Sequence, residues 1–191
     1  MYWKIATTGQ SFLGDMLLEI FSQTERMPGY LLFLAAIVSI FGENFLPILV
    51  IQSVIDSVTC VLIAALGCYV YPKHYGIFGW FAAVWPNLFI HSGLILGDSL
   101  FVFFFVWFLL SFTGLLHKPT ILAAVVTGAA LGLATLVRPT TQFIIFLTPL
   151  LLPIILTISK MKVREAVFHS LLVFAVSVMC VAPVLMKNHN K

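Results

Sequence analysis

The chain has 191 residues, of which 61% are hydrophobic and only 9% are charged, and its mean hydropathy is +1.10. A soluble domain does not need so much apolar surface, so the composition predicts an all-α integral membrane protein that crosses the bilayer several times. The net charge of +3 is small, and no basic patch interleaves with aromatic residues, which argues against nucleic acid as a partner. The three cysteines lie in apolar runs without disulfide or zinc spacing, so we interpret them as packing residues.

The first 26 residues or so predict an amphipathic helix that lies in the membrane interface. Apolar residues from Phe12 to Phe21 recur on one helical face, whereas Asp15, Glu19 and Gln23 fall on the opposite face. Residues 30–41 then form an apolar stretch of about 12 residues, which is too short to span a bilayer. We expect a short juxtamembrane helix here, ended by Gly42 at the position that glycine favours after a helix.

Six apolar runs of spanning length follow along the chain. They cover residues 45–71, 76–92, 98–116, 120–137, 141–159 and 165–186. No internal repeat or flexible linker separates them, so we predict a single membrane domain over residues 1–191, with 1–44 as its interfacial part and 45–186 as its spans.

Proline and glycine positions add detail to these spans. Prolines well inside a helix predict kinks, and they occur at Pro86, Pro149, Pro153 and Pro183. Two pairs of glycines have the GxxxG spacing that lets two membrane helices approach closely: Gly93 with Gly97, and Gly128 with Gly132.

The turns between the spans predict the orientation of the chain. Five basic residues lie in the first, third and fifth turns (Lys73, Lys118, Lys160, Lys162 and Arg164), against one, Arg138, in the second and fourth. Because cytoplasmic loops are enriched in lysine and arginine, Asp98 and Arg138 are expected to share the outer face with both termini. An external N-terminus without a signal peptide leads us to expect a further span upstream, with Met1 internal to a longer protein.

Asp98 and Arg138 are the leading candidates for a binding site, since each lies in a tight turn at the same predicted face. A guanidinium forks onto phosphate oxygens, and a carboxylate can position a hydroxyl, hold a metal ion or take a proton. The pair therefore suits an amphiphile that carries a phosphate. The alternatives are structural: Asp98 could serve only as a helix cap, and Arg138 as an arginine that reaches to the interface.

Asp56 is a second candidate, because it lies in the middle of a predicted span one turn from Gln52. An ionisable residue inside a membrane is a functional candidate by default. The alternative is a satisfied structural cluster with Ser53 and Ser57. His91 lies near Asp98 in sequence, and we interpret it as an interfacial residue.

Four elements in order carry a family resemblance. They are residues 26–35 (RMPGYLLFLA), 92–101 (SGLILGDSLF), 128–140 (GAALGLATLVRPT) and 183–188 (PVLMKN). Together they resemble the polytopic glycosyltransferases with the GT-C fold, of the dolichyl-phosphate-mannose protein mannosyltransferase type (family 39-type). The likeness extends over nearly the whole chain.

The resemblance implies a GT-C-like enzyme that moves a sugar from a polyprenyl-phosphate carrier to a protein, lipid or glycan acceptor at the outer or lumenal face. We expect a multi-pass protein of a bacterial plasma membrane. Asp98 would then be catalytic, and the substrate would be bound by Arg138, Arg26, Tyr30, Lys187 and Asn188. No cofactor is assigned, and the need for a divalent metal is left open.

One departure from the family pattern bears on activity. Residues 1–6 (MYWKIA) resemble the segment that follows the family's principal aspartate, so that aspartate is expected upstream of Met1 and the isolated chain is expected to be inactive. The alternative function is a non-catalytic membrane protein that binds or transports a lipid-linked head group.

Overall fold

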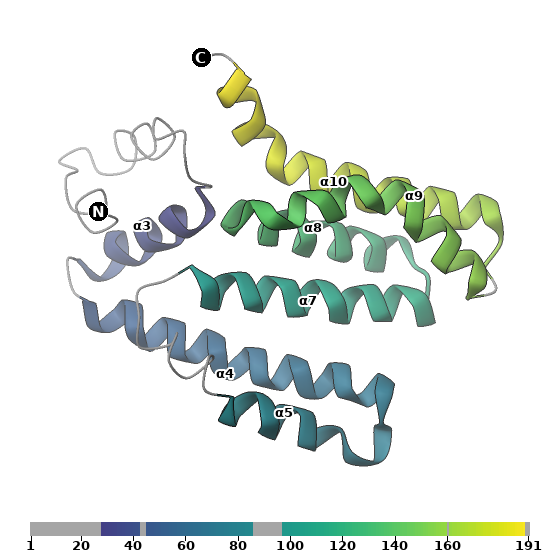
Figure 1. The fold of residues 1–191 in the computed structure, drawn as a ribbon. Helices are drawn as coiled ribbons and strands as arrows, with labels where there is room; N and C mark the ends of the chain where they lie inside the picture. The colour runs from purple at the N-terminus through teal and green to yellow at the C-terminus, as the bar shows by residue number, and fades with distance from the viewer. Residues whose placement is uncertain (1–27, 43–44, 86–96, 160, 190–191) are drawn as a thin grey trace.

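The computed structural model describes residues 28–42, 45–85, 97–159 and 161–189, with side chains as far as Val184 at the C-terminal end (Figure 1). All regular secondary structure in these ranges is helical, which confirms the all-α class. The elements are α3 (Gly29–Phe41), α4 (Phe45–Val70), η1 (Pro72–His74), α5 (Tyr75–Val84), α7 (Asp98–His117), α8 (Ile121–Val137), η2 (Pro139–Thr141), α9 (Gln142–Ile158) and α10 (Val163–His189). The predicted interfacial helix, Arg26, His91 and Gly93 lie outside the described residues, as do the side chains of Lys187 and Asn188.

Four described helices are long and apolar enough to cross a membrane. They cover Leu46–Val70, Asp98–His117, Pro139–Ile158 and Val163–Val184, close to four of the six predicted spans. The predicted span 120–137 is helical over the 17 residues of α8, about 25 Å at 1.5 Å per residue, slightly less than the hydrocarbon core of about 30 Å. The chain is therefore a multi-spanning membrane protein.

The predicted span 76–92 is not one continuous helix, which corrects the sequence interpretation. Helix α5 ends at Val84, and Trp85 is extended, with φ −66° and ψ 119°. Trp85 precedes Pro86, and a proline ring disfavours the helical conformation of the residue before it. Pro86 was predicted to kink a helix; the helix instead ends ahead of it, and Pro86 itself lies outside the described residues.

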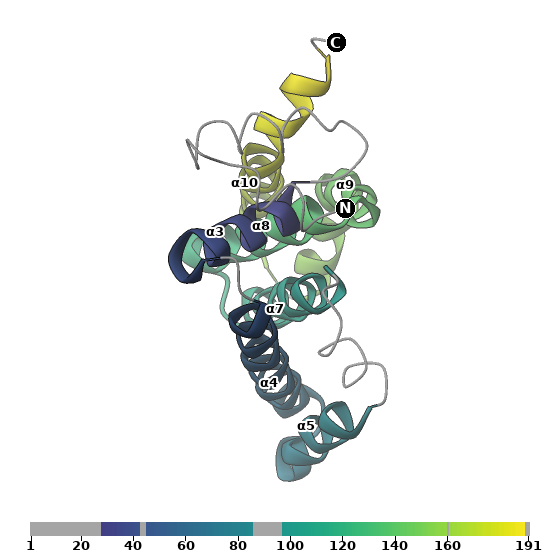
Figure 2. The same ribbon diagram turned by 90° about the vertical axis from the view of Figure 1, so that its left-hand side faces the viewer.

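The long helices run back and forth beside one another (Figure 1). Helix α8 packs against both α7 and α10, α9 packs on α10, and α4 lies on the other side of α7 and carries α5. Figure 2 shows α5 at the edge of the molecule, away from α8 to α10. Helix α3 crosses near the C-terminal end of α8, where the backbone of Leu136 lies so close to Gly29 that a Cβ there would be 2.6 Å from its carbonyl oxygen.

The seam between α8 and α10 is built on small residues, as the spacing of Gly128 and Gly132 predicts. A Cβ on Gly128 would lie 2.7 Å from the carbonyl oxygen of Val173, and one on Gly132 would lie 2.6 Å from the Cβ of Cys180. The hydroxyl of Ser177 crosses the seam and donates a hydrogen bond to the carbonyl oxygen of Gly128 at 3.0 Å. Lipid provides little hydrophobic force between helices, so close backbone approach and such hydrogen bonds hold the seam together.

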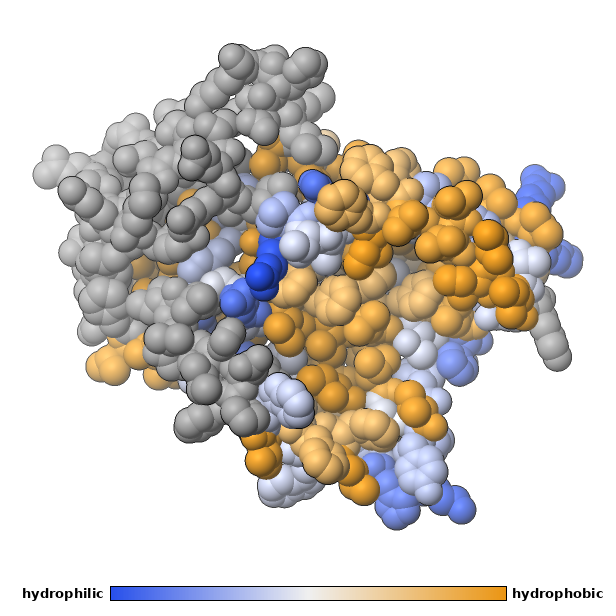
Figure 3. Space-filling model, in the orientation of Figure 1, coloured by the Kyte–Doolittle hydropathy of each residue, from blue (hydrophilic) through white to orange (hydrophobic). Residues whose placement is uncertain are grey.

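Helix α3 ends as predicted. Gly42 has φ +73°, a conformation that L side chains rarely adopt, and its N–H donates to the carbonyl oxygen of Val38 at 2.9 Å. The space-filling view in Figure 3 shows broad hydrophobic surface over the helices and hydrophilic atoms at the ends of the helices on its right-hand side, opposite α3. That distribution suits helices that meet lipid along their length and water at their ends.

Candidate functional site

The site forms where α8 ends and α7 begins. Arg138 is the residue after α8 and precedes Pro139, which explains its extended backbone at φ −141° and ψ 122°. Two buried threonines hold the turn that follows: the hydroxyl oxygens of Thr135 and Thr141 are 2.9 Å apart, and the Thr141 hydroxyl donates to the carbonyl oxygen of Arg138 at 3.2 Å. The backbone conformation of Arg138 at the end of α8 is therefore fixed by residues close to it in sequence.

Asp98 and Arg138 meet in an ion pair. Arg138 Nη1 donates to Asp98 Oδ1 at 2.9 Å, and the two side chains are 51% and 30% exposed, respectively. The structure thus brings together two residues that are 40 positions apart, at one end of the bundle. Figure 3 shows a small hydrophilic patch near the middle of the view, bordered by hydrophobic surface.

The structure places Asp98 one residue after the cap position of α7. Asp98 is the first residue of α7, and Gly97, which has no side chain, occupies the cap position. A carboxylate in the first turn still suits the partial positive charge of the helix start. Asp98 also pairs with the guanidinium of Arg138.

Phe101 lies beneath the arginine. The Arg138 Cζ atom is 5.6 Å from the centre of the Phe101 ring, within the range in which an aromatic face attracts a cation. Phe101 follows Asp98 by three residues, so both lie on one face of α7. The sequence analysis did not select Phe101. The available signal was its spacing: an aromatic residue three positions after an acid, at the start of a helix, lies on the same helical face as that acid.

A buried polar contact lies directly behind this ion pair. The hydroxyl of Ser99, which is 2% exposed, donates to Asp56 Oδ2 of α4 at 3.2 Å, and Gln52 is buried one turn earlier on α4. Ser53 and Ser57, the alternative partners of Asp56 in the sequence analysis, each donate a hydrogen bond to a carbonyl oxygen of their own helix. Asp56 instead connects α4 to the residue that follows Asp98.

Tyr30, a predicted substrate-binding residue, is 5% exposed. Its ring packs against Gly97, where a Cβ would lie 3.2 Å from a ring carbon. Tyr30 therefore supports the start of α7 from the side of α3. The structure places it next to the site, with its ring buried.

An apolar groove lies between α7 and α9, with α8 and α10 behind it. Its volume is about 220 Å³, and its lining is almost entirely apolar. The residues along it are Phe108, Phe112, Thr127, Ile144, Leu147, Thr148, Leu151, Leu152, Ile155 and Val173. Along α9 the groove runs from Ile144 to Ile155, about 16 Å at 1.5 Å per residue.

In the ranges that the structure describes, no three His, Cys, Asp or Glu side chains lie close enough together to hold a metal ion. A divalent metal beside Asp98 would therefore need ligands from the substrate or from other parts of the chain.

Comparison with known proteins adds one finding. A family model described as dolichyl-phosphate-mannose-protein mannosyltransferase matches residues 25–186. Neither a curated protein nor a solved structure gives a significant match. The matched range includes α3, both sides of the ion pair and the apolar groove.

Proposed function

The chain belongs to the dolichyl-phosphate-mannose-protein mannosyltransferase family, and we propose that its Asp98–Arg138 pair receives the phosphate of a polyprenyl-phosphate-linked sugar at the outer face of the membrane. The family consists of membrane glycosyltransferases that use a lipid-linked sugar. The observation that carries the proposal is the ion pair itself, which presents a half-exposed guanidinium at one end of an otherwise apolar helix bundle.

The guanidinium suits the leaving group of the transfer. It has five N–H donors in a planar fork, and its contact with Asp98 uses one nitrogen, Nη1. When the acceptor hydroxyl forms its bond to the anomeric carbon of the sugar, the bond from that carbon to the phosphate oxygen breaks. The phosphate keeps the electron pair, and Arg138 stabilises the negative charge that develops there.

Asp98 has two tasks in this proposal. It orients the guanidinium through the bond of 2.9 Å to Nη1, and it supplies a carboxylate at the place where the acceptor hydroxyl loses its proton. Ser99, held by Asp56, and Tyr30, packed on Gly97, keep the start of α7 in place. Accurate placement matters because a shift of about 1 Å can cost about a hundredfold in rate.

The apolar groove is the proposed path of the isoprenoid chain. It begins at Ile144, six residues beyond Arg138, and continues along α9 into the depth of the bundle. A carrier whose phosphate lies at Arg138 can therefore bury its hydrocarbon between α7 and α9. An aromatic wall of Phe108 and Phe112 and an aliphatic wall of Ile144, Leu147 and Leu151 suit branched, unsaturated chains.

The first test measures the affinity of polyprenyl phosphate for the protein in lipid nanodiscs. Arg138→Lys keeps the charge but loses the fork, so we expect affinity to fall by about 1–3 kcal/mol, the scale of a charge-assisted hydrogen bond. The matched control is Arg164→Lys at the opposite end of the bundle, which should bind like wild type. An arginine that only reaches to the interface would tolerate lysine, so unchanged binding by Arg138→Lys would contradict the proposal.

The second test separates an enzyme from a lipid-binding protein. Asp98→Asn keeps the size of the side chain and an oxygen that can accept from Arg138, but it loses the charged carboxylate, so sugar transfer should fall while the carrier still binds. If wild type binds carrier tightly but never transfers a sugar, the chain belongs to a binding or transport protein. Asp98→Asn with wild-type turnover would remove Asp98 from the mechanism.

The third test fills the groove. Leu151 lines it, whereas its neighbour Leu150 is 64% exposed on another face of α9. Leu151→Trp should weaken carrier binding about tenfold, because a bulky ring occupies space that the chain needs. Leu150→Trp serves as the matched control and should change binding less than about twofold. Equal effects of the two substitutions would rule out the groove as the path.

The outer-face assignment rests on the basic turns. Single cysteines at Lys118 and Lys162 should react with a membrane-impermeant maleimide only from the cytoplasmic side, and one at Pro139 only from outside. The three native cysteines would first be replaced by serine or alanine. Labelling in the opposite sense would place the Asp98–Arg138 pair in the cytoplasm and end the outer-face proposal.

A further inference from the structure

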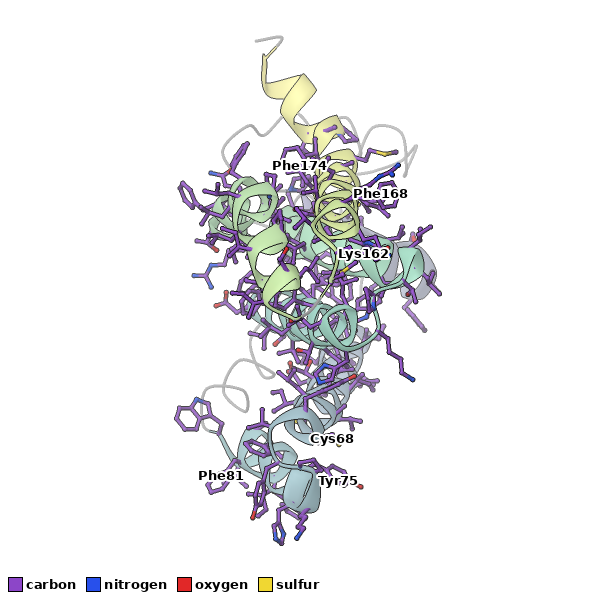
Figure 4. All side chains as sticks on the ribbon, turned by 90° about the vertical axis from the view of Figure 1, so that its right-hand side faces the viewer. Cys68, Tyr75, Phe81, Lys162, Phe168 and Phe174 are labelled. Carbon is purple, nitrogen blue, oxygen red and sulfur yellow. The ribbon has the colours of Figure 1, made fainter. Side chains whose placement is uncertain are left out.

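A second cavity lies at the end of the bundle opposite the ion pair. It has a volume of about 300 Å³ and lies where α7 turns into α8 and α9 turns into α10. Its lining residues are Leu116, His117, Pro119, Leu156, Ser159, Met161, Lys162 and Glu165. Figure 4 looks onto this end of the molecule and labels Lys162 there.

The cavity combines two opposite charges with an apolar wall. Lys162 precedes the first residue of α10, and Glu165 lies in the first turn of that helix. Within the described part of the chain, neither side chain takes part in an ion pair. Leu116, Leu156 and Met161 form the apolar side.

His117 adds a third polar group. Its Nδ1 donates to the carbonyl oxygen of Thr113 at 2.9 Å, and its ring packs on Tyr69 with 4.8 Å between ring centres. These contacts hold the ring in place. They leave Nε2 as the ring nitrogen for a ligand, either as an acceptor or, in the protonated ring, as a donor.

We propose that this cavity binds the head group of a zwitterionic phospholipid that carries a primary ammonium, with its phosphate at Lys162 and its ammonium at Glu165. A ligand with both charges satisfies both side chains, whereas a purely anionic head group would leave Glu165 facing a phosphate. The ammonium of such a lipid donates hydrogen bonds to a carboxylate, which a quaternary ammonium cannot do.

The position of the cavity identifies the ligand as a lipid. The turns at this end lie at a membrane face, because they join helices that are long and apolar enough to span the bilayer and are rich in lysine and arginine. One water needs only about 10–15 Å³ of such space, so 300 Å³ accommodates a phosphate with a short amine. The apolar wall of Leu116, Leu156 and Met161 suits the first carbons of the acyl chains.

Simpler structural roles exist for the same charged residues. A glutamate in the first turn favours the start of a helix, and a lysine at a membrane face can extend its amine into the head-group layer. Those roles need no selectivity among lipids. The proposal predicts selectivity and its reversal by a single charge change, so the two are separable by experiment.

The experiment measures lipid retention by native mass spectrometry of the protein taken from nanodiscs. The discs contain equal amounts of phosphatidylethanolamine, phosphatidylcholine and phosphatidylglycerol. Wild type should retain phosphatidylethanolamine about tenfold over each of the other two, a ratio in keeping with one charge-assisted hydrogen bond. Equal or greater retention of phosphatidylglycerol by wild type would overturn the proposal.

Two variants examine the two charges. Glu165→Gln removes the partner of the ammonium, so phosphatidylethanolamine should fall to the level of phosphatidylcholine while phosphatidylglycerol rises. Lys162→Ala should lower the retention of phosphatidylethanolamine about tenfold, the scale of one charge-assisted hydrogen bond. If Glu165→Gln leaves the order of the three lipids unchanged, the ammonium has no site there and the proposal fails.

Matched controls exclude general attraction to basic residues. Lys118 lies in the same turn as His117 but does not line the cavity, and Lys118→Ala should change retention less than twofold. The same loss in Lys118→Ala as in Lys162→Ala would show a nonspecific surface effect and overturn the assignment. All three side chains are exposed, and an unchanged melting temperature checks that each variant is folded.

Soluble phosphoethanolamine provides the final arm. It has the same phosphate and ammonium but no acyl chains, so it should compete only at concentrations far above those of the lipid. Displacement of the lipid by an equal concentration of the soluble compound would overturn the lipid assignment. The site is independent of the Asp98–Arg138 pair, so failure of either proposal leaves the other unaffected.

Discussion

Each end of the helix bundle has one acidic and one basic side chain, but the two pairs are arranged differently. At one end, Asp98 and Arg138 are paired at 2.9 Å and lie over a buried contact between Ser99 and Asp56. At the other end, Lys162 and Glu165 both line a cavity, and neither is ion-paired with a described residue.

The two pairs differ in how firmly neighbouring residues hold the charged side chains in place. The guanidinium of Arg138 is fixed by its partner and by the Phe101 ring, and α8 leading to it is held on α10 by Gly128 and Gly132. Such preorganisation suits chemistry on a bound substrate. An acid and a base that line a cavity without pairing suit the binding of a ligand with both charges. Substitutions at the two ends should therefore affect the stability of the fold to different degrees.

The largest effect should come from Gly132→Ala. A Cβ there would meet the Cβ of Cys180 at 2.6 Å and the carbonyl oxygen of Ser177 at 3.1 Å, so α8 and α10 must separate. Overpacking of this kind costs about 1–3 kcal/mol. The matched control is Gly76→Ala near the other end, where nothing lies within 4 Å and alanine should be neutral or slightly stabilising.

Thermal unfolding in detergent micelles measures both variants. We also expect Gly132→Ala to weaken carrier binding, because Arg138 directly follows α8. Equal melting temperatures for Gly132→Ala and Gly76→Ala would show that the seam does not support the ion-pair end.

A smaller effect is expected from Asp56→Ala. The substitution leaves the buried Ser99 hydroxyl without its carboxylate partner, and hydrogen bonds between membrane helices contribute about 0.6 kcal/mol on average and up to about 1.7. A double-mutant cycle with Ser99→Ala isolates the coupling energy of the two side chains. Glu165→Ala at the exposed end should lie within about 0.5 kcal/mol of wild type, as surface substitutions usually do. A coupling energy of zero would make the contact between α4 and α7 unimportant for stability.

The smallest effect on stability should come from the ion pair itself. Its two side chains are 51% and 30% exposed, and pairs with such access to water contribute about 0–1 kcal/mol. The Asp98→Ala variant should therefore have a melting temperature close to that of wild type, while its affinity for the carrier differs from that of wild type. A loss of stability larger than that of Gly132→Ala would mean that Asp98 is chiefly a structural residue.

Much of the candidate site could be predicted from the sequence, and the limits have clear physical causes. Asp98 and Arg138 were selected because acids and arginines are rare and costly in an apolar chain, and because alternate turns must lie on the same face. Tyr30 was assigned to the substrate from resemblance alone, and its burial against Gly97 depends on the angle at which α3 crosses. Ser99, which the structure brings to Asp56, was not expected as its partner, because it is 43 residues away in sequence whereas Ser53 and Ser57 are close.

Other features depend on tertiary packing from the start. Phe101 contacts Arg138 because α7 and α8 are adjacent and antiparallel, which periodicity within either helix does not reveal. The cavity of Lys162 and Glu165 exists because two separate turns meet at one end of the bundle. The sequence shows a proline, Pro86, directly after Trp85, where α5 has ended. Whether a proline kinks a helix or ends it depends on the surrounding packing.

The sequence by itself determined that this chain is an all-helical membrane protein and located its four longest apolar helices, because hydrophobicity and backbone hydrogen bonding leave few alternatives inside a bilayer. It also determined the close contact at Gly128 and Gly132 and the end of α3 at Gly42, since glycine acts through its own lack of a side chain. Only the tertiary structure decided which distant polar groups meet, namely Asp98 with Arg138 and Ser99 with Asp56, and which turns close the cavity that Lys162 and Glu165 line. Side chains 40 or more residues apart are brought together by helix crossing and rotation, which depend on the packing of all the helices at once.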